Sequence, residues 1–441
     1  MSDGRSSPAR FDVNLRQIMR FLTCLLVLAT LPACMVLGVR EQRRKLDAAC
    51  QIGGRVDAEQ NPTAPLIVVL ARQIGTDPAS RDSWQISDHF VAETPGLWQF
   101  AASAGTYGVV AFQDLNRDLR AQPEEPYLPL EKDRVFSCVP GERRTDLALK
   151  IPAAGRPRLG ETIDVATLQV RTVAEQFDLS LGQVTAVGEV ADLSNPRFDE
   201  SVAEDGLWRP YDFLFEGRPG VYFLGPYDRT RIPVLFVHGI SGTPRHFVPL
   251  IEKLDQHRFQ PWVYYYPSGT SLARVADHLT QTMRKLQIEY RFKSFVVVAH
   301  SMGGLVARGF LLRYREGSGA AAIPLFVSIS TPWDGHKAAQ LGAKSPIPVL
   351  AWDDLSPGSE YLRSLYVRDP GVPHDLIFSF RNEGVAIGEA SDGTISVASQ
   401  LLPAVQKGAV RVEGYNETHM GVLKAAAVSE RLNELLSAVE K

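Results

Sequence analysis

Residues 294–308 read Ser-Phe-Val-Val-Val-Ala-His-Ser-Met-Gly-Gly-Leu-Val-Ala-Arg, and they predict a strand, a tight turn and a helix in succession. The β-branched run at the start is typical of a buried strand, and apolar residues at helical spacing follow the two glycines. In such a turn the middle residue presents its side chain above the sheet, so small residues must stand two positions to either side. Ala299 and Gly303 occupy those positions, which makes Ser301 the candidate nucleophile.

The first of the two small positions usually holds glycine, and Ala299 departs from that pattern. Alanine has no atom beyond Cβ, so a close crossing of strand and helix is retained. The alternative is a serine in an ordinary strand-to-helix loop, because short serine-glycine patterns also arise by chance.

The composition limits what the chain can be. Its 441 residues exceed the usual size of one domain, so we expect two folded domains and a tail, with 45% hydrophobic residues to fill their cores. A net charge of −3 creates no basic field, which argues against a nucleic-acid partner. No zinc-type cysteine spacing or phosphate-binding glycine loop occurs, so catalysis is expected to use side chains without a cofactor.

The first 40 residues carry the features of an export signal. Arg16 and Arg20 precede an uncharged apolar run at 21–39, which contains Leu-Pro-Ala-Cys ending at Cys34. This pattern resembles a bacterial lipoprotein signal, in which Cys34 becomes the lipidated first residue. The alternatives are an uncleaved membrane anchor, because the run is long enough to span a bilayer, and an ordinary cleaved signal. All three place the folded part outside the cytoplasm, and the first two attach it to a membrane.

Residues 50–151 alternate short strand-like runs with turn residues, which predicts a small all-β sandwich. Cys50 and Cys138 bracket this segment, and export to an oxidising compartment favours a disulfide between them over two buried free thiols. Within it, residues 95–112 carry Pro-Gly and Gly-Thr-Tyr leading into Val-Val-Ala-Phe. This stretch resembles the transthyretin-like or carboxypeptidase-regulatory type of accessory domain.

A candidate calcium loop follows directly. Asp114, Asn116, Asp118 and Glu125 stand at the first, third, fifth and twelfth places of the loop, the spacing of oxygen ligands that wraps a calcium ion. The sixth place, where a sharp turn favours glycine, holds Leu119. The alternative is a solvated acidic turn whose side chains cap local backbone groups.

Residues 152–204 begin with a linker rich in proline, glycine and arginine, and the rest of this segment has no clear assignment. From 205 to 441 strand-like and helix-like segments alternate, which predicts a mostly parallel sheet covered by helices on both faces. Ser301 then lies at the end of a later strand, where such sheets place their ligands.

A serine nucleophile needs donors for the developing oxyanion, a base and an acid that orients the base. The glycine-rich turn after the strand at 233–237 predicts that the N–H groups of Ile240 and Met302 form the oxyanion hole. His238 lies in the same turn, and we expect it to brace the loop by hydrogen bonds.

His419 is the candidate base, because it is the histidine that follows the last predicted strand and leads into a C-terminal helix. His300, next to the nucleophile, is expected to point the opposite way. Asp392, in an Asp-Gly turn after the penultimate strand, is the candidate acid. Asp334, after the strand one earlier, is its rival.

Five motifs then stand in order: Val-His-Gly-Ile-Ser-Gly, Ala-His-Ser-Met-Gly-Gly-Leu-Val-Ala-Arg, Ser-Thr-Pro-Trp, Asp-Gly-Thr-Ile-Ser-Val and Thr-His-Met-Gly-Val-Leu. Together they resemble the α/β-hydrolase superfamily, in particular its lipase- and esterase-like members, over residues 205–441. The resemblance implies acyl transfer to water through an acyl-serine, with an ester or lipid-like substrate. The alternatives are a thioesterase or amidase with the same triad, and an inactive scaffold that binds through the β-sandwich.

The segment 336–374 is long for a connection between two strands and mixes glycine, proline and apolar residues. We expect a partly helical cap that covers the serine and lines an apolar acyl pocket. The alternative is a helical excursion that packs away from the site.

Overall fold

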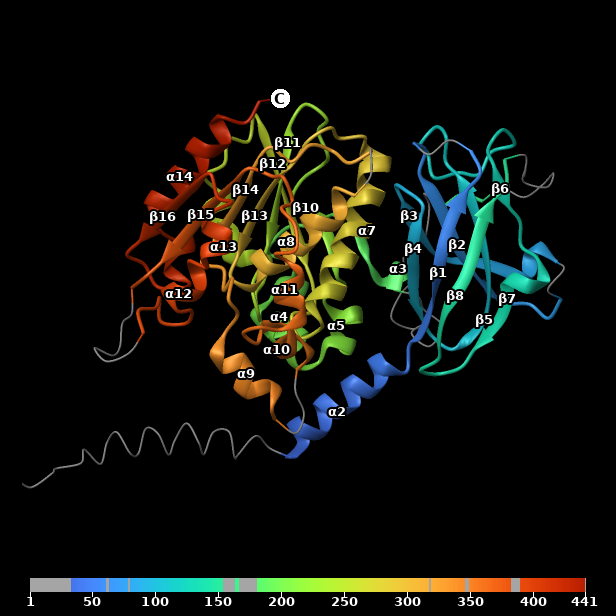
Figure 1. Cartoon of the computed structure of the whole chain (residues 1–441), viewed down its shortest axis with the longest axis horizontal. Helices are drawn as coiled ribbons and strands as arrows, with labels where there is room; N and C mark the ends of the chain where they lie inside the picture. The colour runs from blue at the N-terminus through green and yellow to red at the C-terminus, as the bar shows by residue number, and fades with distance from the viewer. Residues whose placement is uncertain are drawn as a thin grey trace, which may run out of the picture.

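The computed structural model describes residues 33–60, 63–77, 80–153, 163–165, 181–316, 319–345, 349–381 and 389–440. The expected signal before residue 33 and most of the expected linker lie outside these ranges. Figure 1 shows an all-β region, β1 to β8, beside an α/β region that carries the rest of the described chain.

The all-β region is a sandwich of two sheets. The first sheet has the order β4 (Gly96–Ala102), β1 (Cys50–Ala58), β8 (Arg143–Ile151). The second has the order β3 (Trp84–Ala92), β2 (Leu66–Gln73), β5 (Gly105–Gln113), β6 (Tyr127–Leu128), with β7 (Val135–Cys138) also paired to β5. Side chains such as Val68, Trp98 and Tyr107 fill the space between the sheets, as the alternating strand pattern predicts.

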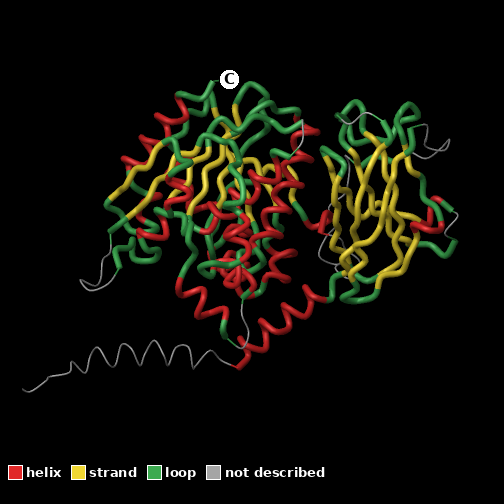
Figure 2. The backbone as a smooth tube through the Cα atoms, in the orientation of Figure 1, coloured by secondary structure: helices red, strands yellow, loops and turns green. Residues whose placement is uncertain are grey.

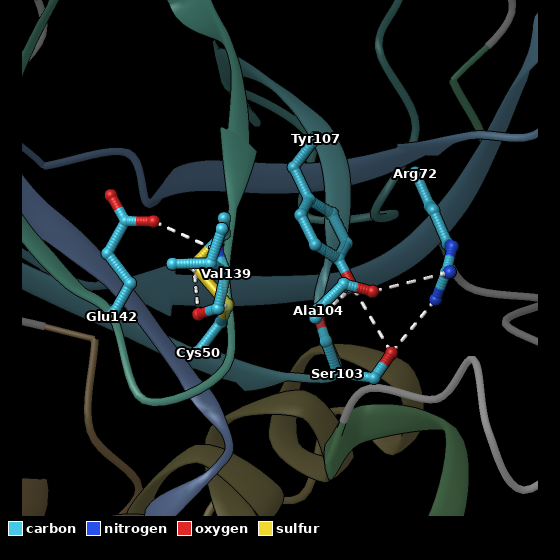
Figure 3. The surroundings of a disulfide bond; sticks show 8 residues. Cys50, Arg72, Ser103, Ala104, Tyr107, Val139 and Glu142 are labelled. Atoms are coloured by element: carbon cyan, nitrogen blue, oxygen red, sulfur yellow. Dashed lines mark hydrogen bonds between the residues drawn. A yellow bond between two sulfur atoms is a disulfide. The ribbon is translucent and has the colours of Figure 1, made fainter.

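A disulfide between Cys50 and Cys138 joins the two sheets, as predicted. Cys50 opens β1 in the first sheet, and Cys138 ends β7 in the second. Figure 3 shows Cys50 beside Val139, at the end of β7. The bond therefore fixes one edge of the sandwich core.

The α/β region contains an eight-stranded sheet. Its order is β9 (Ala186–Val190), β10 (Gly220–Phe223), β12 (Phe259–Tyr265), β11 (Ile232–Val237), β13 (Val296–His300), β14 (Phe326–Ile329), β15 (His374–Ser379), β16 (Arg411–Tyr415). All neighbours are parallel except β10 and β12. The strands from β11 to β16 therefore end at one edge of the sheet, and the fold is the α/β-hydrolase fold.

Helices cover both faces of this sheet, as Figure 2 shows in red around the yellow strands. The helices of the α/β region are α4 (Glu200–Trp208), α5 (Pro210–Glu216), α6 (Val248–Ile251), α7 (Leu272–Tyr290), α8 (Met302–Tyr314), α9 (Lys337–Ala343), α10 (Leu350–Leu355), α11 (Glu360–Ser364), α12 (Val397–Gln400), α13 (Pro403–Gln406) and α14 (Ala426–Ser437). The short helix α3 (Leu181–Val184) contacts β3 and β4 of the sandwich instead. Alternate β13 residues face opposite cores, with Val297 toward α7 and α8 and Val298 toward α6 and α14. The continuous apolar run in this strand is explained by burial on both faces.

The sandwich is attached to α7 through strand β3. Lys285 of α7 lies 3.3 Å from a carboxylate oxygen of Asp88. The side-chain oxygen of Gln281 accepts the N–H of Val91 at 3.0 Å. Ile288 of the same helix packs into the apolar cluster on the outer face of the second sheet.

Helix α2 (Ala33–Asp47) precedes the sandwich in sequence but binds the α/β region (Figure 1). The buried oxygen of Gln42 accepts the N–H groups of Tyr211 and Asp212, each at 3.1 Å, and its amide donates to the Asp212 carboxylate at 2.9 Å. Arg209, at the N-cap of α5, makes no side-chain cap. Gln42 therefore caps α5 from another helix.

Helix α2 runs across residue 40, where the N-terminal segment was expected to end. Among the described residues, no helix has the length and apolar character needed to cross a membrane. The part of the apolar run at 21–39 that precedes residue 33 lies outside the described residues.

Replacing both disulfide cysteines by serine is expected to lower the free energy of unfolding by about 4 kcal/mol. The bond closes a loop between residues 88 apart, and that closure restricts the unfolded chain. Urea unfolding of the β-sandwich signal, with and without reductant, measures the effect. Reductant should not change the unfolding of the double-serine variant. Equal midpoints for oxidised and reduced wild-type protein would contradict the prediction.

Candidate active site

The turn between β13 and α8 holds Ser301 in a strained conformation. Its φ of 55° and ψ of −133° lie where side chains other than glycine are rare. A Cβ atom at Gly303 would stand 2.3 Å from the carbonyl oxygen of Val237, so a larger residue does not fit. Ala299 is accommodated in the fully buried strand, and its departure from glycine leaves the turn intact.

The structure brings Ser301, His419 and Asp392 into one line of hydrogen bonds. The Ser301 hydroxyl lies 2.9 Å from Nε2 of His419, and Nδ1 of His419 lies 2.7 Å from Oδ2 of Asp392. All three residues are buried. Because a carboxylate only accepts, the proton of a neutral imidazole is assigned to Nδ1, which leaves Nε2 free to accept the serine proton.

The carboxylate of Asp392 is held by five donors. They are the backbone N–H groups of Thr394 and Ile395, the Ser379 hydroxyl, the Gln400 amide and the His419 ring. Burial by itself would raise the pKa of Asp392, but the hydrogen bond and charge of His419, with the other donors, hold the pKa below its usual value. Asp392 is therefore an ionised and immobile partner for the histidine.

Asp334, the rival acid, lies elsewhere. Its side chain is exposed, while the neighbouring Trp333 is fully buried. Its backbone N–H donates to the hydroxyl of Ser399, which fixes the turn without directing the carboxylate at His419. The geometry therefore selects Asp392.

Two backbone N–H groups adjoin the serine where an oxyanion would form. Met302 begins α8, so its N–H has no acceptor within the helix. The N–H of Ile240 donates to no acceptor among the described residues. A Cβ atom at Gly239 would lie 2.8 Å from Cβ of Ser301, so glycine lets this loop approach the nucleophile. Ile240 and Met302 both line the cavity described below.

His238 braces the loop, as expected. Its Nδ1 lies 2.8 Å from the Gly239 oxygen, and its Nε2 accepts the N–H of Tyr266 at 3.3 Å. Burial lowers the pKa of His238 to about 3, so the ring stays neutral. It takes no part in proton transfer from the serine.

His300 requires a correction, because it does not simply point away. Its Nε2 donates to the backbone oxygen of His419 at 2.9 Å, and the two rings lie 4.8 Å apart. His300 therefore supports the loop that carries the candidate base. Ser379 and Gln400 were missed from the sequence, because each contacts a residue of another loop and neither belongs to a recognisable motif. His300 stands in the motif of the nucleophile, but its contact with His419 leaves no signal in the sequence.

A cavity of about 410 Å³ opens above Ser301. It is lined by Gly239, Ile240, Gly242, His246, His300, Ser301, Met302, Pro332, His336, Ala338, Ala339, Trp352, Leu355, Thr394, Ile395, His419 and Met420. No lysine, arginine, aspartate or glutamate is among these described lining residues. Helices α9 and α10 contribute one apolar wall, as expected of the cap, whereas Tyr361 and Leu365 are buried in the core.

The structure favours the alternative to the calcium interpretation, a capped acidic turn. The Asp114 carboxylate accepts the N–H groups of Asp118 and Leu119, both at 3.0 Å, and the Glu125 carboxylate accepts those of Leu115 and Gln122. Burial raises the pKa of Glu125 to about 7, although these backbone bonds oppose it. Within the described ranges, no group of three or more acidic, histidine or cysteine side chains is placed to hold a metal ion. Asn116 donates to Asp118, so the loop is a capped turn.

Cys34 lies in the first turn of α2, and its side chain is outside what the structure describes. Its expected lipidation therefore stays a prediction.

Residues 268–401 match the model of a family described as "Alpha/beta hydrolase of unknown function (DUF915)". No curated protein matches this sequence. Among solved structures, the chain is similar to a Bacillus licheniformis lipase, BlEst2 in mature form, with 15% identity and a TM-score of 0.40 over 50% of this chain and 98% of the other.

It is also similar to a lipase-esterase related protein from Clostridium acetobutylicum, with 13% identity and a TM-score of 0.35 over 49% of this chain and 99% of the other. A phospholipase from Legionella pneumophila, PlaB, shares 19% identity with a TM-score of 0.33 over 38% and 45%. All three TM-scores are below 0.5, so nothing about substrate is transferred from these proteins.

Asp392→Asn is expected to lower kcat by roughly 10²- to 10⁴-fold, because an asparagine gives neither tautomer control nor stabilisation of the imidazolium. Asp334→Asn, the matched control, should cost less than about tenfold. Steady-state hydrolysis of p-nitrophenyl octanoate by folded variants measures both. The reverse ranking would move the acid to Asp334.

Proposed function

We propose that this protein is a serine hydrolase that cleaves carboxylic esters through an acyl-serine intermediate. The observation that carries the proposal is the line of hydrogen bonds from Ser301 through His419 to Asp392 on the floor of an apolar cavity. A buried serine, a histidine with a free Nε2 and a fully bonded carboxylate are the parts that acyl transfer needs. An inactive scaffold would have no need to keep all three aligned.

In the first half of the reaction, the oxygen of Ser301 attacks the ester carbonyl carbon while Nε2 of His419 takes the hydroxyl proton. The carbonyl oxygen becomes an oxyanion, which the N–H groups of Ile240 and Met302 stabilise. When this intermediate collapses, the bond to the leaving alkoxide breaks and His419 returns the proton to it. The products of this half are an alcohol and an acyl-Ser301.

In the second half, water takes the place of the alcohol. His419 removes a proton from the water as it attacks the acyl carbon, and the same two N–H groups hold the second oxyanion. Collapse releases the carboxylic acid and returns the proton to Ser301. Throughout, ionised Asp392 stabilises the positively charged His419 ring, and the hydrogen bond from His300 keeps the loop of His419 in place.

The acyl part of the substrate is proposed to lie against the cap. Ala338, Ala339, Trp352 and Leu355 give this wall an apolar surface. Trp352 is held edge-on against Trp208 of α4, with ring centroids 5.7 Å apart, so it is a fixed wall. A neutral hydrocarbon chain suits such a surface better than a charged acyl group does.

We also place the protein in the cell envelope, attached through a lipid on Cys34 or through an N-terminal anchor. The support is the sequence pattern of the first 40 residues and the disulfide, which forms in oxidising compartments. Unchanged membrane association of a Cys34→Ala variant would count against the lipid anchor. The β-sandwich is then an accessory domain outside the cytoplasm.

Ser301→Ala is expected to lower hydrolysis of p-nitrophenyl octanoate by roughly 10⁴-fold or more, because removing the nucleophile removes the covalent route. Ser437→Ala is the matched control, since its hydroxyl only donates to the Glu434 carbonyl at the end of α14. Initial rates on purified protein provide the measurement. Equal activity of wild type and Ser301→Ala would reject the proposed nucleophile.

Trp352→Ala is expected to lower the ratio of kcat/KM for octanoate over acetate p-nitrophenyl esters by about tenfold, because it removes apolar surface from the acyl wall. Leu341→Ala is the control, because Leu341 lies on α9 of the same cap but is 72% exposed. Both variants should keep activity toward the acetate ester. An unchanged ratio for Trp352→Ala would show that the cap has no such role.

A further inference from the structure

The cavity above Ser301 differs in chemistry between its two sides. The cap supplies aliphatic and aromatic side chains on one side. On the other side, the 3₁₀ turn η5 (Pro244–Phe247) follows the oxyanion loop and contributes His246. The imidazole of His246 has no role in the steps described above.

The ring of His246 is available to a ligand, unlike the other histidines that line the cavity. His300 donates to the oxygen of His419, and His336 donates to the oxygen of Thr394 at 2.8 Å. His419 is engaged at both nitrogens. Neither ring nitrogen of His246 makes a hydrogen bond to any described residue.

The nearest carboxylate oxygen to His246, on Glu200, is 3.9 Å from its Nε2, beyond hydrogen-bond distance. The Glu200 side chain is 85% exposed, so this contact is weak and leaves the ring free to turn toward the cavity.

His246 lines the same cavity as His419 and Met420, which belong to the loop of the candidate base. Nε2 of His419 must reach the leaving oxygen to return its proton, so the alcohol lies beside the loop that begins at His419. The cavity thus brings His246 together with the oxyanion loop and with the loop of the candidate base.

The charge state of His246 limits what it can bind. Burial lowers its pKa, and Lys424 adds to this effect while Glu200 opposes it. The ring is therefore neutral at pH 7, with one nitrogen that donates and one that accepts. Such a ring matches a hydroxyl group, which also donates and accepts, and offers no positive charge to a phosphate.

We propose that His246 is a specificity-determining residue that binds a free hydroxyl on the alcohol part of the ester. The preferred substrates are then partial esters of a polyol such as glycerol, with the acyl chain against the cap and the free hydroxyl at His246. This inference rests on the proposed function and specifies the alcohol part of its ester substrate.

The test compares two esters of one acid, 1-monooctanoylglycerol and ethyl octanoate. His246→Ala should lower kcat/KM about tenfold to 10²-fold for the glycerol ester and leave the value for the ethyl ester within about twofold. Only the glycerol ester has a free hydroxyl, so only it loses a hydrogen bond to His246. His246→Gln, which keeps a donor and an acceptor, should recover part of the loss. His257→Ala, an exposed histidine outside the cavity lining, is the control and should change neither ester.

An equal loss of kcat/KM on both esters would show that His246 acts on the triad of Ser301, His419 and Asp392. No loss on either ester would show that His246 has no role. Both results overturn the proposal. Binding of 1-monooctanoylglycerol to Ser301→Ala, measured by calorimetry, tests the subsite without catalysis. There His246→Ala should weaken binding about tenfold. If His246→Ala does not weaken this binding, the subsite is overturned. If the wild type hydrolyses neither ester but His246→Ala still weakens binding, only the proposed function is overturned.

Discussion

The hydrogen bond between Nδ1 of His419 and Oδ2 of Asp392 is the contact on which the site depends. It joins the loops that follow β15 and β16, which are parallel neighbours and so release their chains at the same edge of the sheet. A buried carboxylate is costly unless its oxygens are bonded, and here the surrounding loops supply four more donors. The sheet brings the two loops together, and this network holds His419 and Asp392 in line with Ser301.

The turn that carries Ser301 is held by the elements packed around it. The strained turn of Ser301 persists because β13 is buried on both faces and α8 packs closely over β11. Helix α2 adds a connection from the other end of the chain, because Gln42 caps α5, which contacts α4, and Trp208 of α4 holds Trp352 in the cavity wall. The segment before the sandwich is therefore part of the structure that supports the cavity.

The sequence predicted those parts of the fold and site that depend on local patterns or on chain order. Ser301 lies in a motif with its own geometry, and His419 follows from its place after the last strand. The sequence favoured Asp392 but left Asp334 as a rival, because both follow a strand; burial and the hydrogen bond to His419 distinguish them in the structure. Contacts that join distant residues, such as His300 to His419, leave no local signal.

The acidic loop at 114–125 poses a related choice. The same spacing of acidic side chains serves either a cation or backbone N–H groups, and the sequence does not show which one takes the oxygens. In the structure, the Asp114 and Glu125 carboxylates are bonded by the backbone of their own loop.

The central claim is that Ser301 is a nucleophile activated by His419, and covalent labelling with a fluorophosphonate tests it most directly. Peptide mass spectrometry of the labelled protein should find one adduct, on Ser301, and His419→Ala should slow its formation by at least about 10³-fold. An unlabelled Ser301 in folded wild-type protein, or an equal rate of labelling in His419→Ala, would contradict the account.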